Sequence, residues 1–169
     1  MALYRAYPIT RASFRRKLAR DATGRTGLKL FKGLVRAAVR RKPPAVKIMG
    51  CQVVLVIAFF AIGRPELYVL LWWLPHITVW RVINRLRSVA EHGGLMRSAD
   101  RRQTTHDVKQ SRLASFWLVP FNIGYHLAHH VDMGVPNWNL PKLQRELVAS
   151  GWVTNDYSYP NYRTLWRAL

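Results

Sequence analysis

The stretch IMGCQVVLVIAFFAIGRPELYVLLWWLPHITVW, Ile48–Trp80, decides the fold, because its only charged residues lie in the turn-like sequence GRPE. That turn separates two apolar runs, Ile48–Ile62 and Leu67–Trp80, of 15 and 14 residues. A helix that crosses a bilayer needs about 20 residues, so each run is short. Lys47 and Arg81 would lengthen both runs by extending their charged ends toward the membrane surface. We expect a helical hairpin through the bilayer; the alternative is a buried helical hairpin in a soluble protein.

Basic residues at the outer ends of this hairpin predict its orientation. Residues 1–47 carry 14 Lys and Arg and a single acid, whereas the connecting turn has only Arg64. By the positive-inside rule, both termini face the cytoplasm and the turn lies on the other side of the membrane. Trp72, Trp73 and Trp80 are aromatic residues of the kind found at membrane interfaces. Pro75 is expected to kink the second helix.

The first 47 residues read as two basic amphipathic helices. The sequence ITRASFRRKLARDATG predicts a helix with Thr10 or Ser13 as its N-terminal cap that stops near Gly24. The following TGLKLFKGLVRAAVRRKPP predicts a second helix that ends at Pro43–Pro44. Its apolar residues recur at helical spacing, at Leu28, Phe31, Leu34, Val35 and Val39. Such a helix lies in the interface against anionic lipid, or else forms a solvated basic face with a small core side.

The charge balance limits the classes of partner. Lys and Arg number 27 against 8 Asp and Glu, a formal net charge of +19, which is typical of proteins that bind nucleic acid or an anionic membrane surface. The chain has no zinc-finger, RNP or KH motif, so we expect no nucleic-acid partner. Cys51 is the single cysteine, which excludes an intramolecular disulfide.

Three histidines in the sequence GYHLAHHVDM form a candidate metal site. On a helix, His126 and His130 share a face, while His129 is rotated by about 100° from His130. The trio can therefore give two ligands to one metal and direct the third at a second metal nearby. Neutral imidazole suits zinc, iron, copper and nickel. The alternative is a histidine cluster without metal.

A fourth candidate ligand, His92, lies in the sequence RLRSVAEHGG. It follows the hairpin by about three helical turns, on the same inferred side of the membrane as the trio, and Gly93 and Gly94 are expected to end its helix. Glu91 is either an acceptor that orients a ligand or a charged surface residue, and we favour the surface residue. His76 is expected to pack against a helix, and His106 to lie in a polar loop.

The order of these motifs resembles a known family. An apolar hairpin, AEHGG, PFNIGYHLAHH and VPNWNLPKLQREL follow one another, as in the C-terminal half of the membrane fatty acid desaturases, the histidine-box di-iron enzymes. The residues that match the carboxy-terminal HxxHH box of that family and the segments around it are Asn122, Tyr125, His126, His129, His130, Pro136, Leu140, Pro141 and Leu143. His92 corresponds to an additional metal-binding histidine of many members.

The resemblance implies an all-α membrane protein that forms a single partial desaturase domain over residues 1–169. Its parts are a basic interfacial segment at 1–47, the membrane hairpin at 48–80, and a cytosolic histidine-box region at 81–169. The implied iron ligands are His92, His126, His129 and His130, with Asn122 and Glu91 supporting them rather than binding metal.

The implied chemistry is the O2-dependent removal of two hydrogens from the acyl chain of a lipid substrate by a di-iron site. An electron donor of the ferredoxin or cytochrome b5 type would supply the reducing equivalents. Related members hydroxylate lipids instead. The alternative from a different class is a non-catalytic, small basic membrane protein that binds lipid.

Two motifs of the family do not occur in the sequence, namely the amino-proximal HxxxH box and the middle HxxHH box. A di-iron site built on imidazoles draws ligands from all three boxes, so we expect this chain alone not to desaturate a lipid. It would be a truncated or mis-started reading frame, or a half that needs a partner. Coding DNA upstream of Met1, or a neighbouring frame, is then expected to encode the two missing boxes.

Overall fold

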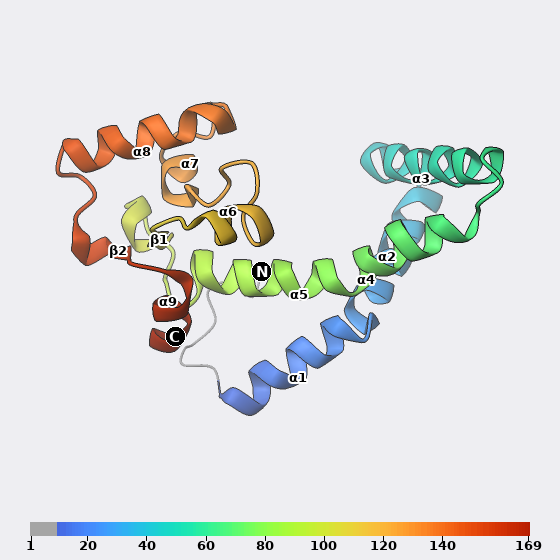
Figure 1. The fold of residues 1–169 in the computed structure, drawn as a ribbon, viewed down its shortest axis with the longest axis horizontal. Helices are drawn as coiled ribbons and strands as arrows, with labels where there is room; N and C mark the ends of the chain where they lie inside the picture. Colours follow the sequence, from blue (N-terminus) through green and yellow to red (C-terminus); the bar gives the residue numbers. More distant parts are fainter. Residues whose placement is uncertain (1–9) are drawn as a thin grey trace. The chain divides into compact units, whose positions relative to one another are not determined.

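The computed structural model describes residues 10–169, which fall into two compact units (Figure 1). Residues 11–83 form one, here called the hairpin unit. Residues 84–169, together with residue 10, belong to the other, the histidine unit. Helix α5 (Val79–His92) begins in the first and ends in the second.

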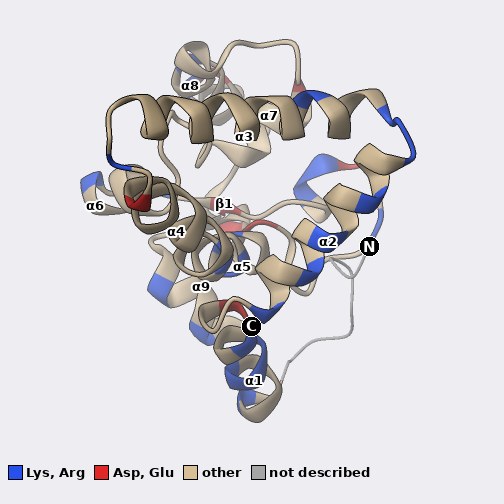
Figure 2. Ribbon diagram, turned by 90° about the vertical axis from the view of Figure 1, so that its right-hand side faces the viewer, with Lys and Arg blue, Asp and Glu red and all other residues tan. Residues whose placement is uncertain are grey.

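The hairpin unit opens with two basic helices, α1 (Arg11–Ala22) and α2 (Arg25–Val39). Gly24, with φ +76°, ends α1 in the left-handed conformation that glycine adopts without strain. Asp21 is fully buried and accepts a hydrogen bond from the Thr26 hydroxyl, which ties the two helices together. Lys and Arg positions, blue on the ribbon of Figure 2, recur along both helices. The prediction of a helix that stops near Gly24 is confirmed.

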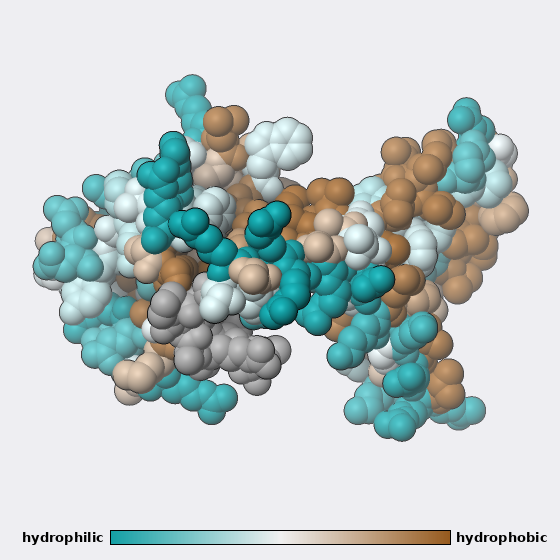
Figure 3. Space-filling model, turned by 90° about the horizontal axis from the view of Figure 1, so that it is seen from below, coloured by the Kyte–Doolittle hydropathy of each residue, from teal (hydrophilic) through white to brown (hydrophobic). Residues whose placement is uncertain are grey.

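Helix α3 (Pro43–Ala61) provides the long apolar element of the chain. The sequence prediction placed Pro43–Pro44 at the end of the preceding helix, but α2 ends at Val39, and the two prolines form the first turn of α3. Proline suits that position because the first N–H groups of a helix have no partner within it. At 19 residues, α3 is the one helix in the described part of the chain with the length and composition to cross a membrane. Apolar side chains gather at the right of Figure 3, the side on which Figure 1 draws the elements of the hairpin unit.

The segment after the GRPE turn, which forms the second arm of the hairpin, is less regular than the first arm, α3. After the turn at Gly63 come a π-helical segment η2 (Tyr68–Trp73), a short helix α4 (Leu74–Ile77) and then α5. A kink was predicted near Pro75, and the structure has a longer irregular segment there. A π segment precedes the proline, and Thr78 leaves helical geometry at φ −115° and ψ −86°. The physical reason is that proline donates no N–H and displaces the carbonyl one turn earlier.

Side chains join η2 to α3. Gln52 Oε1 accepts hydrogen bonds of 3.0 Å from both the Tyr68 hydroxyl and the Trp72 indole N–H. The rings of Phe59 and Tyr68 meet edge to face at 6.3 Å. Because the second arm is interrupted, passage of both arms through a bilayer stays a prediction.

Helix α2 packs closely on α4. A Cβ atom on Gly27 would lie 2.4 Å from the carbonyl oxygen of Ile77, so glycine allows the two backbones to approach. One turn further, the rings of Phe31 and Trp73 meet edge to face at 6.4 Å. The predicted apolar face of α2 is only partly buried, because Val39 at its end is 77% exposed.

The histidine unit is mostly helical and surrounds a small core. One cluster of buried core residues consists of Ala90, Val108, Val119, Tyr162 and Leu165. After α5 the elements are η3 (Arg101–Gln103), β1 (Asp107–Val108), α6 (Arg112–Trp117), α7 (His126–Val131), η4 (Asn137–Asn139), α8 (Leu140–Ala149), η5 (Asn155–Tyr157), β2 (Ser158–Tyr159) and α9 (Tyr162–Ala168). The expected all-α fold is interrupted by β1 and β2, which pair in parallel over two residues.

Candidate metal centre

His92 occupies the last position of α5, where the glycines that follow end the helix as the sequence predicts. Gly94 adopts φ +77°, and the chain turns back toward η3. The Nδ1 atom of buried His92 lies 2.8 Å from the backbone oxygen of Thr104. A carbonyl oxygen only accepts, so in the neutral ring Nδ1 carries the proton and the lone pair is on Nε2, which faces His126 Nε2. This orientation by a carbonyl is what a metal-binding imidazole requires.

His106 holds the same end of α5 without joining the cluster. Its Nε2 donates to the Gly93 carbonyl at 2.7 Å, and its backbone N–H donates to the Glu91 carbonyl at 3.0 Å. Burial lowers the pKa of His106, so the ring is neutral at pH 7. The sequence placed His106 in a polar loop; it does precede β1 in a loop, but its ring is half-buried because it supplies the hydrogen bond that Gly93 needs.

Helix α7 brings His126 and His130 to the same point as His92. The Nε2 atom of His126 lies 3.1 Å from Nε2 of His92 and 3.1 Å from Nε2 of His130. One ligand atom from each of the three histidines lies within 4.8 Å of the other two. Their helical spacing predicted that His126 and His130 share a face, and the fold adds His92 from α5.

Three converging Nε2 atoms leave a problem of hydrogen bonding that a cation solves. His126 Nε2 carries either a proton or a lone pair, so with neutral rings it can donate to His92 or accept from His130 but not both. Imidazole nitrogens bound at about 2.0–2.1 Å to a metal such as zinc lie about 2.9–3.4 Å apart, for octahedral and tetrahedral angles respectively. The spacing of 3.1 Å in the two pairs that include His126 falls inside that interval, and one ligand atom of His92 lies within 4.8 Å of one of His130. The three residues therefore fit a first-row transition metal.

The protonation states also suit a metal. Burial, and then the neighbouring His130 and His92, lower the pKa of His126 to about 2. Burial likewise lowers the pKa of His130 to about 4, with His92 and His129 adding to the effect. Both rings are neutral at pH 7, as binding of a metal through a ring nitrogen requires.

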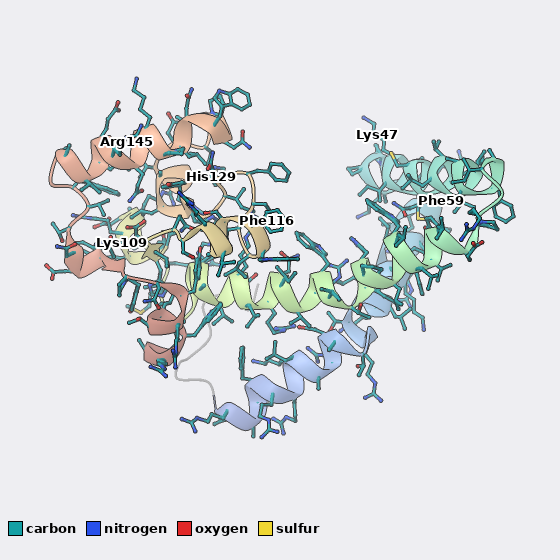
Figure 4. The ribbon with its side chains drawn as sticks, in the orientation of Figure 1. Lys47, Phe59, Lys109, Phe116, His129 and Arg145 are labelled. Atoms are coloured by element: carbon teal, nitrogen blue, oxygen red, sulfur yellow. The ribbon has the colours of Figure 1, made fainter. Side chains whose placement is uncertain are left out.

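His129 lies beside the cluster of His92, His126 and His130 but is not part of it. Its ring centroid is 6.1 Å from that of His126 and 5.8 Å from that of His130 (Figure 4). It lines a cavity of about 220 Å³ together with His126, Arg87 and Asn137. Because His126 lines the same cavity, the role of His129 as a ligand of a second metal stays a prediction.

Glu91 is a correction to the sequence prediction. We favoured a charged surface residue, but Glu91 is only 8% exposed and pairs with Arg87 at 2.5 Å. Its other oxygen, Oε2, lies 3.6 Å from Nε2 of His126. Burial raises the pKa of Glu91, and the Arg87 guanidinium opposes that shift. The ion pair thus forms one wall of the histidine cluster.

Asn122, the other residue expected to support the ligands, is exposed and takes a left-handed conformation at φ +61°. Its carbonyl accepts the Tyr125 N–H at 3.1 Å, which sets the turn that leads into α7. The sequence reasoning missed Arg87 and Thr104. The spacing of Arg87 and Glu91, four residues apart on a helix, was an available signal. Thr104 acts through its backbone carbonyl, which every residue type has, so residue type carried no signal for it.

A family model described as fatty acid desaturase matches residues 3–166. The chain belongs to the fatty acid desaturase family. It is also similar to the dihydrorhizobitoxine desaturase of Bradyrhizobium elkanii, at 26% identity over 87 residues. That match covers 51% of this chain and 25% of the relative, so the chain matches about a quarter of that protein's length. No solved structure matches the chain.

Proposed function

We propose that this chain contributes part of the di-iron site of a membrane enzyme that introduces a double bond into the acyl chain of a lipid, using O2. The observation that carries the proposal is the convergence of three imidazole Nε2 atoms from α5 and α7 in a chain of the desaturase family. The iron would supply the oxidising power for removing two hydrogens from an unactivated chain.

The chain's own residues hold and orient the metal ligands. His92, His126 and His130 would bind one iron, and His129, which is not part of that cluster, would bind the second. The Thr104 carbonyl fixes the tautomer of His92, and burial keeps His126 and His130 neutral.

Further ligands would have to come from outside these 169 residues. The chain has six histidines, and the remaining two are engaged elsewhere. His76 contacts Arg81 in the hairpin unit, and His106 donates to Gly93. The HxxxH and second HxxHH motifs are absent from the sequence, so we infer that these 169 residues do not turn over substrate alone.

The partners follow from the chemistry. An acyl lipid would reach the site from the membrane, and a ferredoxin or cytochrome b5 type protein would deliver electrons on the cytoplasmic side. The family membership and the apolar helix α3 support membrane association.

The test is co-production of this chain with a polypeptide that carries the two missing boxes, in a host without its own desaturase. Iron per chain and the fatty acids of the host lipids are measured together. We expect about two irons per complex and a new unsaturated fatty acid, both lost in His126→Ala and His129→Ala while the chain stays in the membrane. His106→Ala is the comparison, with a milder effect. Full activity in His129→Ala would contradict the assignment.

A second function, non-catalytic lipid binding, is favoured by the charge of the hairpin unit. Residues 11–83 carry 15 Lys and Arg against two acids, Asp21 and Glu66. Metal content separates the two functions, because a lipid-binding protein without catalysis would purify without stoichiometric iron. A hydroxylated product in place of an unsaturated one would identify the related lipid hydroxylases.

A further inference from the structure

The hairpin unit contains a cavity that includes none of the four candidate ligands. It encloses about 300 Å³, the lower end of the range of about 300–1,000 Å³ for ligand pockets. Phe31 and Leu34 of α2, Ile48 of α3 and Trp73 of η2 supply apolar walls. These walls suit a hydrocarbon chain.

One end of the cavity is polar and cationic. Arg81, in the first turn of α5, lines it together with His76 and Gln52. The Arg81 Nη2 atom lies 2.7 Å from Nε2 of His76, whose ring stacks on Trp72 with an angle of 14° between the planes. The guanidinium is thereby held in one orientation at the end of an apolar space.

Arg81, which lines the cavity, also has an unsatisfied donor. Its Nε atom is buried and has no hydrogen-bond partner among the described residues. A buried donor of a charged group that lacks a partner is costly, so an acceptor at this position is strongly favoured. Neither acid of the hairpin unit supplies it: Glu66 pairs with Arg64, and buried Asp21 accepts from Thr26.

We propose that this cavity binds one anionic phospholipid, with its phosphate on the Arg81 guanidinium and one acyl chain along the apolar walls. A phosphate accepts two parallel hydrogen bonds from a guanidinium, which would satisfy Nε and one terminal nitrogen together. Residues 11–83 carry 15 Lys and Arg but only two acids, which favours an anionic over a zwitterionic headgroup. This site is separate from the proposed di-iron chemistry and needs no metal.

Native mass spectrometry of the purified chain in detergent tests the proposal, with phosphatidylglycerol and phosphatidylcholine of identical acyl chains as probes. We expect one retained phosphatidylglycerol per chain, and binding weaker by about tenfold or more in Arg81→Gln, as loss of a charged hydrogen-bonded pair implies. Arg81→Lys keeps the charge but loses the fork and should also bind more weakly. Leu34→Trp fills the apolar part and should exclude the lipid.

Arg36→Gln is the matched control, because it removes the same charge from an exposed position on α2. It should bind like the wild type, as should His126→Ala, which keeps this test independent of the metal site. Circular dichroism verifies that each variant keeps its helices. Equal retention of the two lipids, an equal loss in Arg36→Gln, wild-type binding in folded Arg81→Gln, or full displacement of the lipid by inorganic phosphate would each overturn the proposal.

Discussion

Glu91 and Arg87 form a buried ion pair within the wall of the histidine cluster. Replacing Glu91 by Gln leaves the Arg87 charge without its partner, so we expect a loss of about 1–3 kcal/mol in the free energy of unfolding. Glu146→Gln is the matched control, since Glu146 and Lys142 form an exposed pair of the same helical spacing, at 4.0 Å. Its effect should stay within about 0.5 kcal/mol. Chemical denaturation of the purified variants measures both, and equal effects would show that the Glu91 pair adds no more than a surface pair.

Asp107 predicts a dependence of stability on pH. Its carboxylate is buried and accepts hydrogen bonds from Gln144 and Ser158, and burial raises its pKa despite the Ser158 bond. The folded chain therefore binds the proton more tightly than the unfolded chain does. The stabilisation that this proton provides is present below the unfolded value of about 3.9 and is lost as pH rises through the folded pKa.

Asparagine at position 107 cannot titrate and can still bond to both partners. Asp107→Asn should therefore become more stable relative to the wild type as pH rises from about 4 to about 7. Melting temperatures at the two pH values measure this change, with exposed Asp156→Asn as the control. A difference between Asp107→Asn and wild type that stays constant with pH would contradict the raised pKa.

At the scale of the elements, Gly27 and Gly33 of α2 provide an internal comparison. A Cβ at Gly27 would lie 2.4 Å from the Ile77 backbone oxygen, whereas a Cβ at Gly33 would meet nothing within 4 Å. Gly27→Ala should separate α2 from α4 and cost about 1–3 kcal/mol. Gly33→Ala should instead stabilise the helix by about 0.5–1 kcal/mol. Thermal unfolding in detergent distinguishes them, and a neutral Gly27→Ala would mean that the two helices do not pack this closely.

The sequence predicted helix ends and helical segments where neighbouring residues alone determine them. Gly24 and Gly93–Gly94 ended helices as expected, and the HxxHH motif was helical because its spacing and its apolar neighbours favour a helix. Pro43–Pro44 were read as an end although proline also begins helices, so residue type alone left two answers.

Contacts between distant residues were beyond the sequence. Spacing placed His126 and His130 on one face, but the approach of His92 depends on how α5 meets α7, which no local pattern encodes. Glu91 looked like a surface charge because its burial results from the same packing. The pairing of β1 with β2 involves segments of two residues, too short for any periodicity to be visible.

At the scale of the whole molecule, the predicted topology can be tested by cysteine accessibility. Arg64 and Asp132 are both exposed, so single cysteines at these positions, after replacement of Cys51, are suitable probes. The excess of Lys and Arg at the outer ends of the hairpin predicts that a membrane-impermeant reagent labels position 64 from outside the cell and position 132 only after permeabilisation. Labelling of both positions from the same side would contradict the hairpin through the bilayer.

The π-helical segment Tyr68–Trp73 has a consequence for how the length of the chain can vary. A π turn accommodates one residue more than an α turn while the flanking turns keep their rotational phase. Deleting exposed Leu70 should therefore convert η2 to regular α-helix and leave Tyr68 and Trp72 near Gln52. Helix α3 has no π turn to absorb a deletion. Deleting exposed Val54 would rotate every residue beyond it by about 100°, so that Phe59 would lose its contact with Tyr68. Deletion of one residue is thus tolerated in one arm of the hairpin unit and disruptive in the other.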